Sequence, residues 1–415
     1  MRAKTPLRNR WKAVVAALIG GGTMSLSLPA AGIRCPWNLD TLYATPSWGY
    51  SSSADEPDLQ ELHYDSLSFK GEKVQVFAYY GVPAGPAPAG GWPAVVCVHG
   101  GGGTAFAEWV RRWNQQGYAA ISMDLEGHLP VRENPADPKS PRIPTAHPGP
   151  ERVGVFNDFA EPIEEQWYYH AVAQVVLAHS LIRSFLEVNA AKTGITGISW
   201  GGTLTSTVMG LDNRFKFAIP VYGCGYLPDS DGHQGETIQP GRHSEVVWEN
   251  YDGSAYFTNV TSPTLWVNGT NDMHFPMPST QASAQAVAGA ATLRFALEMP
   301  HGHGPGWKPE EIYAFADSVV KGSDPLVAFG QLRRQGSMAA VGVTTARSLS
   351  GANLLYTTET GPWPKRKWES KPAEIFGDQL RTEIPVGAVA FFFSATDDRG
   401  LMTSSAFMMI EEKLP

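Results

Sequence analysis

Cysteine is scarce in this sequence, whose 415 residues include only three: Cys35, Cys97 and Cys224. No two of them have the close spacing of a CxxC pair, so the sequence predicts neither a disulfide framework nor a zinc cluster.

Basic residues are outnumbered by acidic residues, with 32 lysines and arginines against 40 aspartates and glutamates, which gives a formal net charge of −8. A chain of this charge lacks the electrostatic footprint of a nucleic-acid-binding protein. We therefore expect no metal site and no nucleic-acid partner, and a neutral small molecule or polysaccharide as the ligand.

Internal repeats and long apolar runs are absent beyond the first 31 residues. Those residues combine a basic start, MRAKTPLRNRWK, with the apolar AVVAALIGGGTMSLSL and the small residues of LPAAG. This is the pattern of a secretory signal peptide, cleaved near Ala30 to Gly32. A membrane anchor is the alternative, but the apolar run is short, and interrupted by glycine, for a span of about 20 residues. We expect a signal peptide over residues 1–31 and an exported protein, periplasmic or extracellular, with no stable membrane span after cleavage.

From about Lys73 to Lys321, short β-rich runs alternate with helical patterns. The expected strands are residues 73–80, runs that begin at 93 and 119, and residues 193–199, 217–222, 264–269 and 292–298. The expected helices lie near residues 105–116, 163–185, 201–210, 279–288 and 309–320. Strands that are apolar throughout and separated by helices predict an α/β fold, with a doubly wound, mostly parallel sheet covered by helices on both faces. In such a sheet the functional loops lie at the carboxyl ends of the strands.

Three parts of the chain depart from this alternation. The segments 127–162 and 227–253 are polar and too long for plain connections, so each is either a lid or substrate-contacting excursion or a solvated insertion. After about Asp324 the β-rich runs follow one another without helices, which predicts a small C-terminal antiparallel domain resembling a β-sandwich. We therefore expect the signal peptide (1–31), an N-terminal extension (32–72), an α/β domain (73–323) and a β domain (324–415).

The sharpest local signal is the G-x-S-x-G pattern of residues 197–201, Gly-Ile-Ser-Trp-Gly. Ser199 ends an expected strand and precedes an expected helix, which is the place of a nucleophile elbow in a serine hydrolase. Small residues on both sides of that sharp turn keep the neighbouring backbone from clashing, so that the hydroxyl projects above the sheet. A tight turn whose glycines serve only packing is the alternative interpretation.

A serine hydroxyl needs a base to take its proton and a third group to orient that base. Asp272 follows one later expected strand, and His301 and His303 follow the next, so the acid and the histidines come after Ser199 in the required order. We favour His303 as the base because glycine on either side gives its loop freedom to reach the serine. His301 is the alternative base.

Negative charge that develops on the carbonyl oxygen of an acyl substrate needs hydrogen-bond donors. His99 and the four glycines of residues 100–103 directly follow an expected strand, and glycine lets backbone N–H groups turn toward a ligand without interference from Cβ. A phosphate cradle is the alternative, but the Lys-Ser/Thr ending of a Walker loop is missing. We expect the oxyanion donors to be Gly101, Gly102 and Trp200, the residue after the nucleophile.

Three further residues adjoin these motifs and are candidates for the substrate pocket: His99, His274 and Trp307. His274 follows Asp272 too closely to be an easy partner for it, so it either lines the pocket or packs beside it. Trp307 follows the histidine loop. Aromatic side chains at the entrance of an active site can stack on sugar rings, although aromatic side chains more often pack in the core.

At this point the sequence resembles a known family, the α/β-hydrolases of the branch that includes dienelactone hydrolases, prolyl-oligopeptidase-type esterases and bacterial acetyl xylan esterases. The resemblance covers about residues 93–320, and GAVAFFFSATDDRGLMTSS extends it toward the C-terminus. The segments that carry it are HGGGGTAFAEWVRRWNQQGYAAISMDLEGH, TGITGISWGGT, WVNGTNDMHFP and MPHGHGPGW. Dienelactone hydrolases use a cysteine nucleophile, so the serine found here favours ester over lactone chemistry.

The resemblance implies a carboxylester hydrolase with a Ser-His-Asp triad that acts through an acyl-enzyme, without metal or organic cofactor. It assigns the nucleophile to Ser199, the general acid and base to His303 and the orienting carboxylate to Asp272. Together with export, it leads us to expect removal of acetyl or other short acyl groups from a small-molecule or polysaccharide ester.

Two alternatives belong to other classes. A prolyl-oligopeptidase-type peptidase would usually need an N-terminal propeller or an acidic pocket for a substrate amine, and the expected extension is too short for a propeller. A non-catalytic carbohydrate-binding surface protein is the other, and the complete set of serine, acid and histidine argues against it.

Overall fold

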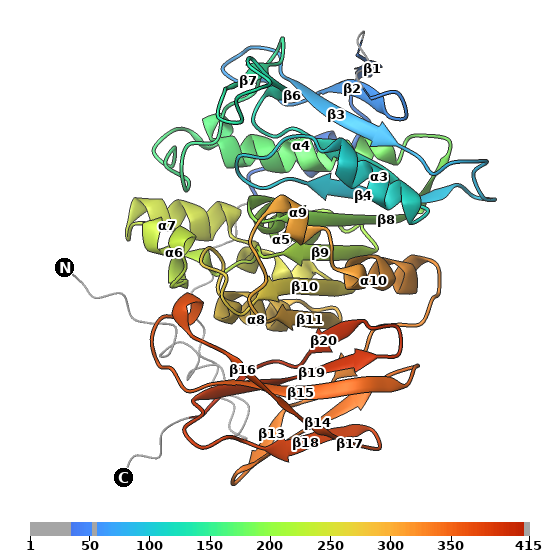
Figure 1. Cartoon of the computed structure of the whole chain (residues 1–415). Coiled ribbons are helices and arrows are strands. Elements are labelled where there is room, and N and C mark those ends of the chain that lie inside the picture. Colours follow the sequence, from blue (N-terminus) through green and yellow to red (C-terminus); the bar gives the residue numbers. More distant parts are fainter. Residues whose placement is uncertain (1–34, 52–55, 411–415) are drawn as a thin grey trace, which may run out of the picture.

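The computed structural model describes residues 35–51 and 56–410 of the chain. The expected signal peptide therefore lies outside the described residues. Figure 1 shows one continuous sheet that runs from the N-terminal strands to the C-terminal strands. Its strand order is β1-β2-β3-β5-β4-β8-β9-β10-β11-β20-β19-β15-β16, with β21 paired to β19.

The middle of this sheet is parallel, as the apolar runs predicted. It consists of β5 (Ala119–Met123), β4 (Trp92–Val98), β8 (Val188–Ile198), β9 (Phe217–Val221), β10 (Thr264–Gly269) and β11 (Ala291–Ala296). Three antiparallel strands extend it at the N-terminal edge: β3 (Gln75–Gly81), β2 (Gln60–Asp65) and β1 (Trp48–Tyr50). The N-terminal extension thus contributes β1 and β2 to the same sheet.

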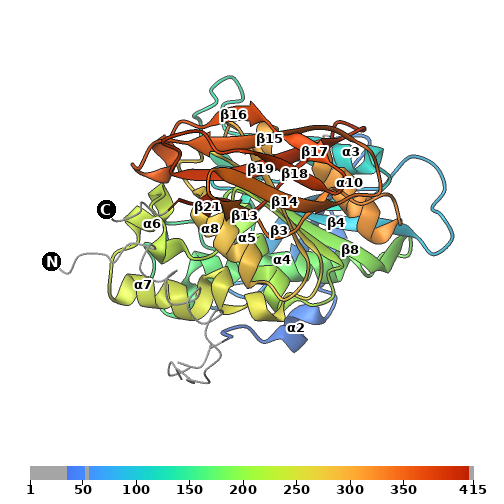
Figure 2. The ribbon, with the colours of Figure 1, turned by 90° about the horizontal axis from the view of Figure 1, so that it is seen from below.

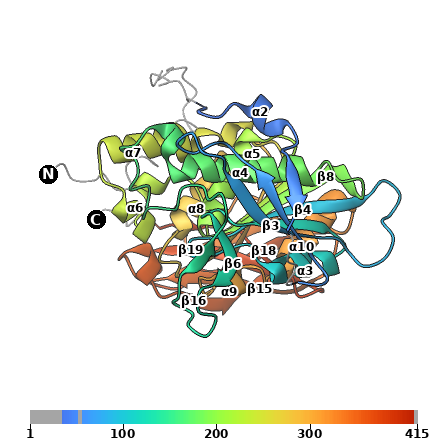
Figure 3. The ribbon, with the colours of Figure 1, turned by 90° about the horizontal axis from the view of Figure 1, so that it is seen from above.

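Helices cover both faces of the sheet because alternate residues of each central strand point to opposite sides. In β4, Val96 and Val98 belong to one buried core, whereas Val95 and Cys97 belong to the other. The first core is covered by α4 (Trp167–Ile182), α5 (Trp200–Leu211) and α8 (Met277–Ala286), and the second by α3 (Ala107–Gln115) and α10 (Glu310–Val320). Figures 2 and 3 show α4 and α5 on one side of the sheet and α3 and α10 on the other. The expected doubly wound architecture is therefore confirmed.

The helix expected over residues 163–185 is divided. A single 3-10 turn spans Ile163–Glu165, Gln166 is extended with φ −81° and ψ 140°, and α4 begins only at Trp167. The extended residue interrupts the helical hydrogen bonds, and the apolar periodicity of the segment did not reveal this break.

The two polar excursions have short elements of their own. Residues 127–162 contain the hairpin of β6 (His128–Arg132) and β7 (Arg142–Pro144). Residues 227–253 contain α6 (His233–Thr237), α7 (Arg242–Val246) and a π-helical turn over Val247–Tyr251. Two further short helices are α2 (Leu39–Tyr43) and α9 (His303–Gly306).

The expected C-terminal antiparallel region is present and consists of two packed sheets. One continues the central sheet through β20 (Met402–Ser404), β19 (Ala390–Asp397), β15 (Leu349–Thr357) and β16 (Glu369–Pro372), with β21 (Met408–Met409) at its side. The other contains β12 (Ala328–Phe329), β13 (Arg333–Gln335), β14 (Met338–Thr344), β17 (Glu374–Phe376) and β18 (Gln379–Glu383). Leu293 of β11 is paired with Ser404 of β20. The sequence pattern did not predict this continuity between the α/β part and the C-terminal region.

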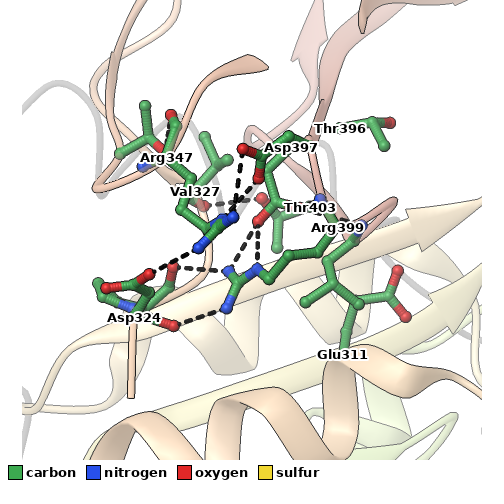
Figure 4. Close-up of polar contacts among 12 residues, drawn as sticks. Glu311, Asp324, Val327, Arg347, Thr396, Asp397, Arg399 and Thr403 are labelled. Carbon is green, nitrogen blue, oxygen red and sulfur yellow. Dashed lines mark hydrogen bonds and ion pairs between the residues drawn. The ribbon is translucent and has the colours of Figure 1, made fainter. Parts of the chain in front are cut away.

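Ionic contacts reinforce this junction (Figure 4). Arg399 donates to the carboxylate of Asp397 at 2.7 Å and to the carbonyl oxygen of Asp324 at 2.9 Å. The Arg347 guanidinium donates to the Asp324 carboxylate at 3.0 Å. Glu311 of α10 accepts from the backbone N–H of Met402 at 2.8 Å. These contacts join α10 and the segment that follows it, which contains Asp324, to the end of β19 and the start of β20.

Candidate active site

Ser199 lies at a sharp turn between β8 and α5, with φ 59° and ψ −119°. Only small neighbours fit around this turn. A Cβ on Gly201 would lie 1.9 Å from the carbonyl oxygen of Val98, and one on Gly197 would lie 2.1 Å from the carbonyl oxygen of Gly201. The strained, positive φ of a non-glycine residue at a strand-to-helix junction is the geometry of a nucleophile elbow.

His301 connects this serine to a buried carboxylate. Its Nε2 lies 2.9 Å from Ser199 Oγ, and its Nδ1 lies 2.7 Å from Asp272 Oδ2. Asp272 is 2% exposed, and its other oxygen accepts from the backbone N–H groups of His274 and Phe275 at 2.9 and 2.8 Å. With Nδ1–H donating to the carboxylate, Nε2 remains free to accept the serine proton.

His303 does not occupy the position that its flanking glycines suggested. Its Nε2 accepts from the backbone N–H of Gly100 at 2.9 Å, and its ring packs 4.7 Å from that of Phe106. Burial lowers the pKa of His303 to about 4, and the neighbouring imidazoles of His99 and His301 add to this effect. The first turn of α9 directs this ring toward the glycine loop, while His301, two residues earlier, faces the serine. The expectation of His303 as base is therefore corrected to His301.

Tyr222, at the end of β9, supports His301 and was not identified from the sequence. Its ring centre lies 4.6 Å from that of His301, and its hydroxyl donates to the carbonyl oxygen of Gly302 at 2.8 Å. Its φ of +34° is unusual for a tyrosine. A tyrosine at the end of a strand carries no local signal that separates this role from ordinary packing.

His99, a suggested pocket residue, is buried and shapes the glycine loop. It is 2% exposed, and its Nε2 accepts from the backbone N–H of Leu125 at 2.9 Å. Its Nδ1–H therefore donates to the carbonyl oxygen of Gly100 at 2.8 Å. Trp307, another suggested pocket residue, is buried as well. It is 5% exposed and packs in the core, 5.5 Å from Trp109.

The glycine loop lies directly against the serine. A Cβ on Gly100 would be 2.8 Å from Ser199 Cβ. The N–H of Gly103 donates to the carbonyl oxygen of Gly100 at 2.9 Å and closes a turn in which Gly102 has φ +69°. Within residues 35–51 and 56–410, the N–H groups of Gly101, Gly102 and Trp200 have no acceptor. These are the three N–H groups that the sequence suggested as oxyanion donors.

Arg152, from the first excursion, also lies at this loop. Its guanidinium carbon is 5.7 Å from the centre of the Trp200 ring, and a Cβ on Gly101 would be 3.0 Å from its Nη2. Its Nε donates to Glu126 at 3.3 Å and its Nη1 to the carbonyl oxygen of Gly154 at 2.8 Å. The excursion over residues 127–162 therefore reaches the site. Nothing local in the sequence singled out this arginine.

His274 lies beside the hydrogen-bonded set of Ser199, His301 and Asp272, with its ring centre 4.5 Å from that of His301, and it is partly exposed. The second excursion reaches it through Gln234 of α6, whose Nε2 is 3.3 Å from His274 Nδ1. Of the three suggested pocket residues, His274 is the one that the structure places beside the reacting groups.

A second histidine and aspartate pair is fully buried. His179 Nδ1 lies 2.7 Å from Asp212 Oδ2 and its Nε2 lies 2.8 Å from Thr193 Oγ1. Both members of the pair are 0% exposed, so a substrate has no access to them. Burial lowers the pKa of His179 to about 4. This cluster serves the packing of α4 against β8.

Over the described part of the chain, histidine, cysteine, aspartate and glutamate side chains nowhere form a group of three or more suited to a metal ion. In the same residues, none of the helices has both the length and the hydrophobicity that crossing a membrane requires.

Two family models match the chain. The acetyl xylan esterase model matches residues 54–230, and the prolyl oligopeptidase family model matches residues 154–321. Both overlap the segment that contains Ser199, and the prolyl oligopeptidase match also includes Asp272 and His301. The resemblance drawn from the sequence is confirmed by these matches.

Solved structures that resemble this chain do so at low sequence identity. An acetyl xylan esterase from Paenibacillus sp. R4 is 21% identical, with a TM-score of 0.53 over 68% of this chain and 92% of that chain. Acetyl xylan esterase 1 from Thermoanaerobacterium sp. JW/SL YS485 is 14% identical, with a TM-score of 0.47 over 65% of this chain and 90% of that chain. An acylaminoacyl peptidase from Pyrococcus horikoshii is 16% identical, with a TM-score of 0.45 over 64% of this chain and 42% of that chain.

Proposed function

We propose that this chain, a serine hydrolase of the α/β-hydrolase superfamily, is an exported carboxylic ester hydrolase that removes acetyl or other short acyl groups from carbohydrate through an acyl-enzyme. The observation that carries the proposal is the hydrogen-bonded series Ser199–His301–Asp272, which lies beside unpaired backbone N–H groups. Carbohydrate as the substrate is supported by the match to the acetyl xylan esterase model.

The first half of the reaction acylates the serine. Ser199 Oγ attacks the ester carbonyl carbon as its proton passes to His301 Nε2, and the Asp272 carboxylate stabilises the imidazolium that forms. The carbonyl oxygen becomes an oxyanion and accepts hydrogen bonds from N–H groups of the glycine loop and Trp200. Each such bond contributes on the order of 3 kcal/mol to the transition state. The bond to the alcohol oxygen then breaks, and His301 gives its proton to that oxygen.

The second half releases the acid. A water molecule loses a proton to His301 Nε2 and attacks the acyl carbon, and the same donors bind the second oxyanion. When the bond to Ser199 breaks, the proton returns from His301 to Ser199 Oγ. The chain's own residues thus account for all four proton transfers.

A substrate panel tests the proposal. Wild-type protein should hydrolyse acetylated xylan, acetylated monosaccharides or glucuronoyl methyl esters, and a fluorophosphonate should label Ser199. The matched control is Ser199→Ala, which should neither be labelled nor hydrolyse p-nitrophenyl acetate. Labelling of the Ser199→Ala protein would show that the nucleophile is another residue.

A prolyl-oligopeptidase-type peptidase is the second candidate because that family model matches residues 154–321. Prolyl peptides in the same panel distinguish the two activities, since a prolyl peptidase would cleave them and a carbohydrate esterase would not. If the wild-type protein neither hydrolysed an ester or peptide nor reacted with fluorophosphonate, a non-catalytic carbohydrate-binding protein would be favoured.

Export is tested separately. The N-terminal sequence of the protein recovered from outside the cytoplasm should begin close to residue 32. An uncleaved chain held in the membrane fraction would favour the anchor interpretation instead.

A further inference from the structure

A second imidazole lies next to the catalytic histidine. The ring centre of His274 is 4.5 Å from that of His301, with 47° between the planes. The backbone N–H of His274 donates to Asp272 Oδ1 at 2.9 Å, while the other oxygen of that carboxylate binds His301. One buried carboxylate therefore fixes the position of both histidines.

Helix α6 fixes the orientation of this second ring. Gln234 is 4% exposed, and its Nε2 lies 3.3 Å from His274 Nδ1. Gly232 precedes α6, and a Cβ at this position would be 2.5 Å from the carbonyl oxygen of His274. The start of α6 is thus packed closely against the backbone of His274, which holds Gln234 next to the imidazole.

The remaining ring nitrogen is an unused donor. Burial lowers the pKa of His274, and the neighbouring His301 imidazole lowers it further, so the ring is neutral around pH 7. Because Nδ1 accepts from the amide of Gln234, the single proton of the neutral ring is on Nε2. In the described ranges of the chain, this Nε2–H has no acceptor, and the side chain is partly exposed to solvent.

The Nε2–H of His274 is close to where the alcohol portion of the ester would lie. In the proposed reaction, His301 delivers its proton to the alcohol oxygen of the ester, so a group packed beside His301 lies near the alcohol. We propose that His274, oriented by Gln234, donates a hydrogen bond to a hydroxyl group of the alcohol portion, next to the ester oxygen. The site then favours esters of polyols, such as partly acetylated sugars, over esters of simple alcohols. This inference rests on the proposed esterase function.

The test pairs a substrate change with a protein change. One substrate is a methyl xyloside acetylated at a single hydroxyl, and its partner is the deoxy analogue that lacks the neighbouring hydroxyl. For the wild-type enzyme we expect kcat/KM to be about tenfold higher for the first, the value of one good hydrogen bond. In His274→Phe, which retains an aromatic ring beside His301 but has no N–H, the ratio should fall to about one.

Two further variants keep the test decisive. His274→Gln retains a side-chain donor and should restore part of the preference. His233→Ala removes the exposed neighbouring ring, 5.7 Å from that of His274, and should leave the tenfold ratio as it is. A His274→Phe protein that lowered kcat/KM equally for both esters would overturn the inference and show that the ring only supports His301.

The outcome also separates this inference from the proposed function. If wild-type protein hydrolyses both esters at equal kcat/KM, the esterase function stands and the hydroxyl subsite is refuted. If it hydrolyses neither these esters nor p-nitrophenyl acetate, the proposed function fails and the subsite fails with it.

Discussion

His301 Nε2 lies 2.9 Å from the Oγ of Ser199, although 102 residues separate the two in sequence. Two residues further along, His303 makes a contact of equal length to a different partner, the backbone N–H of Gly100. The two histidines of one short loop therefore have different tasks. One is placed to exchange protons with the serine, and the other holds the loop that faces it.

We expect His301→Ala to lower kcat by about 10³-fold or more, as the loss of a general base does. His303→Ala should lower it by only about tenfold, because that change removes a hydrogen bond to the glycine loop and leaves the base in place. Steady-state hydrolysis of p-nitrophenyl acetate compares the two variants. A larger loss in His303→Ala would exchange their roles.

Much of this arrangement follows from the sequence, because strand ends determine it. Ser199 directly follows the buried parallel strand β8, and Asp272 follows β10 after two further residues; such strand ends meet at one edge of the sheet. The choice between His301 and His303 depends instead on where α9 begins, and a difference of two residues there changes which ring faces the serine. Sequence patterns do not define helix ends that finely.

The groups that support the site are less visible in the sequence. Arg152 and Gln234 belong to excursions whose path over the sheet is set by tertiary packing. Tyr222 acts through its hydroxyl on Gly302, a contact between residues 80 apart. None of the three has a spacing pattern that reports such contacts.

Tyr222→Phe tests the supporting role of that hydroxyl. The variant retains the ring that packs on His301 but leaves the carbonyl oxygen of Gly302 without its donor. We expect kcat to fall by a few fold to about tenfold, with KM nearly unchanged, since the tyrosine positions His301 rather than binding substrate. An equal loss in Tyr251→Phe, a buried tyrosine whose hydroxyl donates to Gln166, would indicate general destabilisation instead.

The free energy of unfolding should decrease as the pH is lowered through the range in which His303 and His179 titrate. His303 and His179 have a folded-state pKa of about 4 against about 6.5 in the unfolded chain. The unfolded state therefore binds more protons between these values, so the stabilisation is complete above about pH 6.5 and decreases as the pH falls toward 4. His303 should contribute about 2 kcal/mol to the loss of unfolding free energy between pH 7.5 and 5, and His179 should add to this loss.

Urea denaturation at the two pH values measures this loss. In His303→Gln, the glutamine does not titrate but can still accept the hydrogen bond from the Gly100 N–H. The difference in unfolding free energy between the two pH values should therefore become smaller by about 2 kcal/mol. An unchanged slope would mean that His303 does not titrate with folding.

Phe392 of β19 should link the stability of the C-terminal region to that of the α/β part. It is fully buried in the core that α4 and α5 cover, 5.8 Å from Phe295 of β11, whereas its neighbours Phe391 and Phe393 belong to the C-terminal core. Phe392→Ala should cost about 3–5 kcal/mol and lower the midpoints of activity loss and of tryptophan fluorescence together. Phe376→Ala, at a side chain that is 58% exposed, is the control and should change neither. Two separated transitions would show that the C-terminal region unfolds independently.

Gly201→Ala should prevent correct folding of the elbow, because the added Cβ would lie 1.9 Å from the carbonyl oxygen of Val98. Backbone atoms of the central strand β4 cannot move aside at small cost, so we expect little soluble protein and no labelling of Ser199 by fluorophosphonate. Gly304→Ala is the matched control, since it also adds one methyl group to a helical glycine near the site and meets nothing within 4 Å. That variant should remain soluble and be labelled at the wild-type rate. Soluble, fully labelled Gly201→Ala protein would mean that the turn around Ser199 is wider than the contacts of Gly201 indicate.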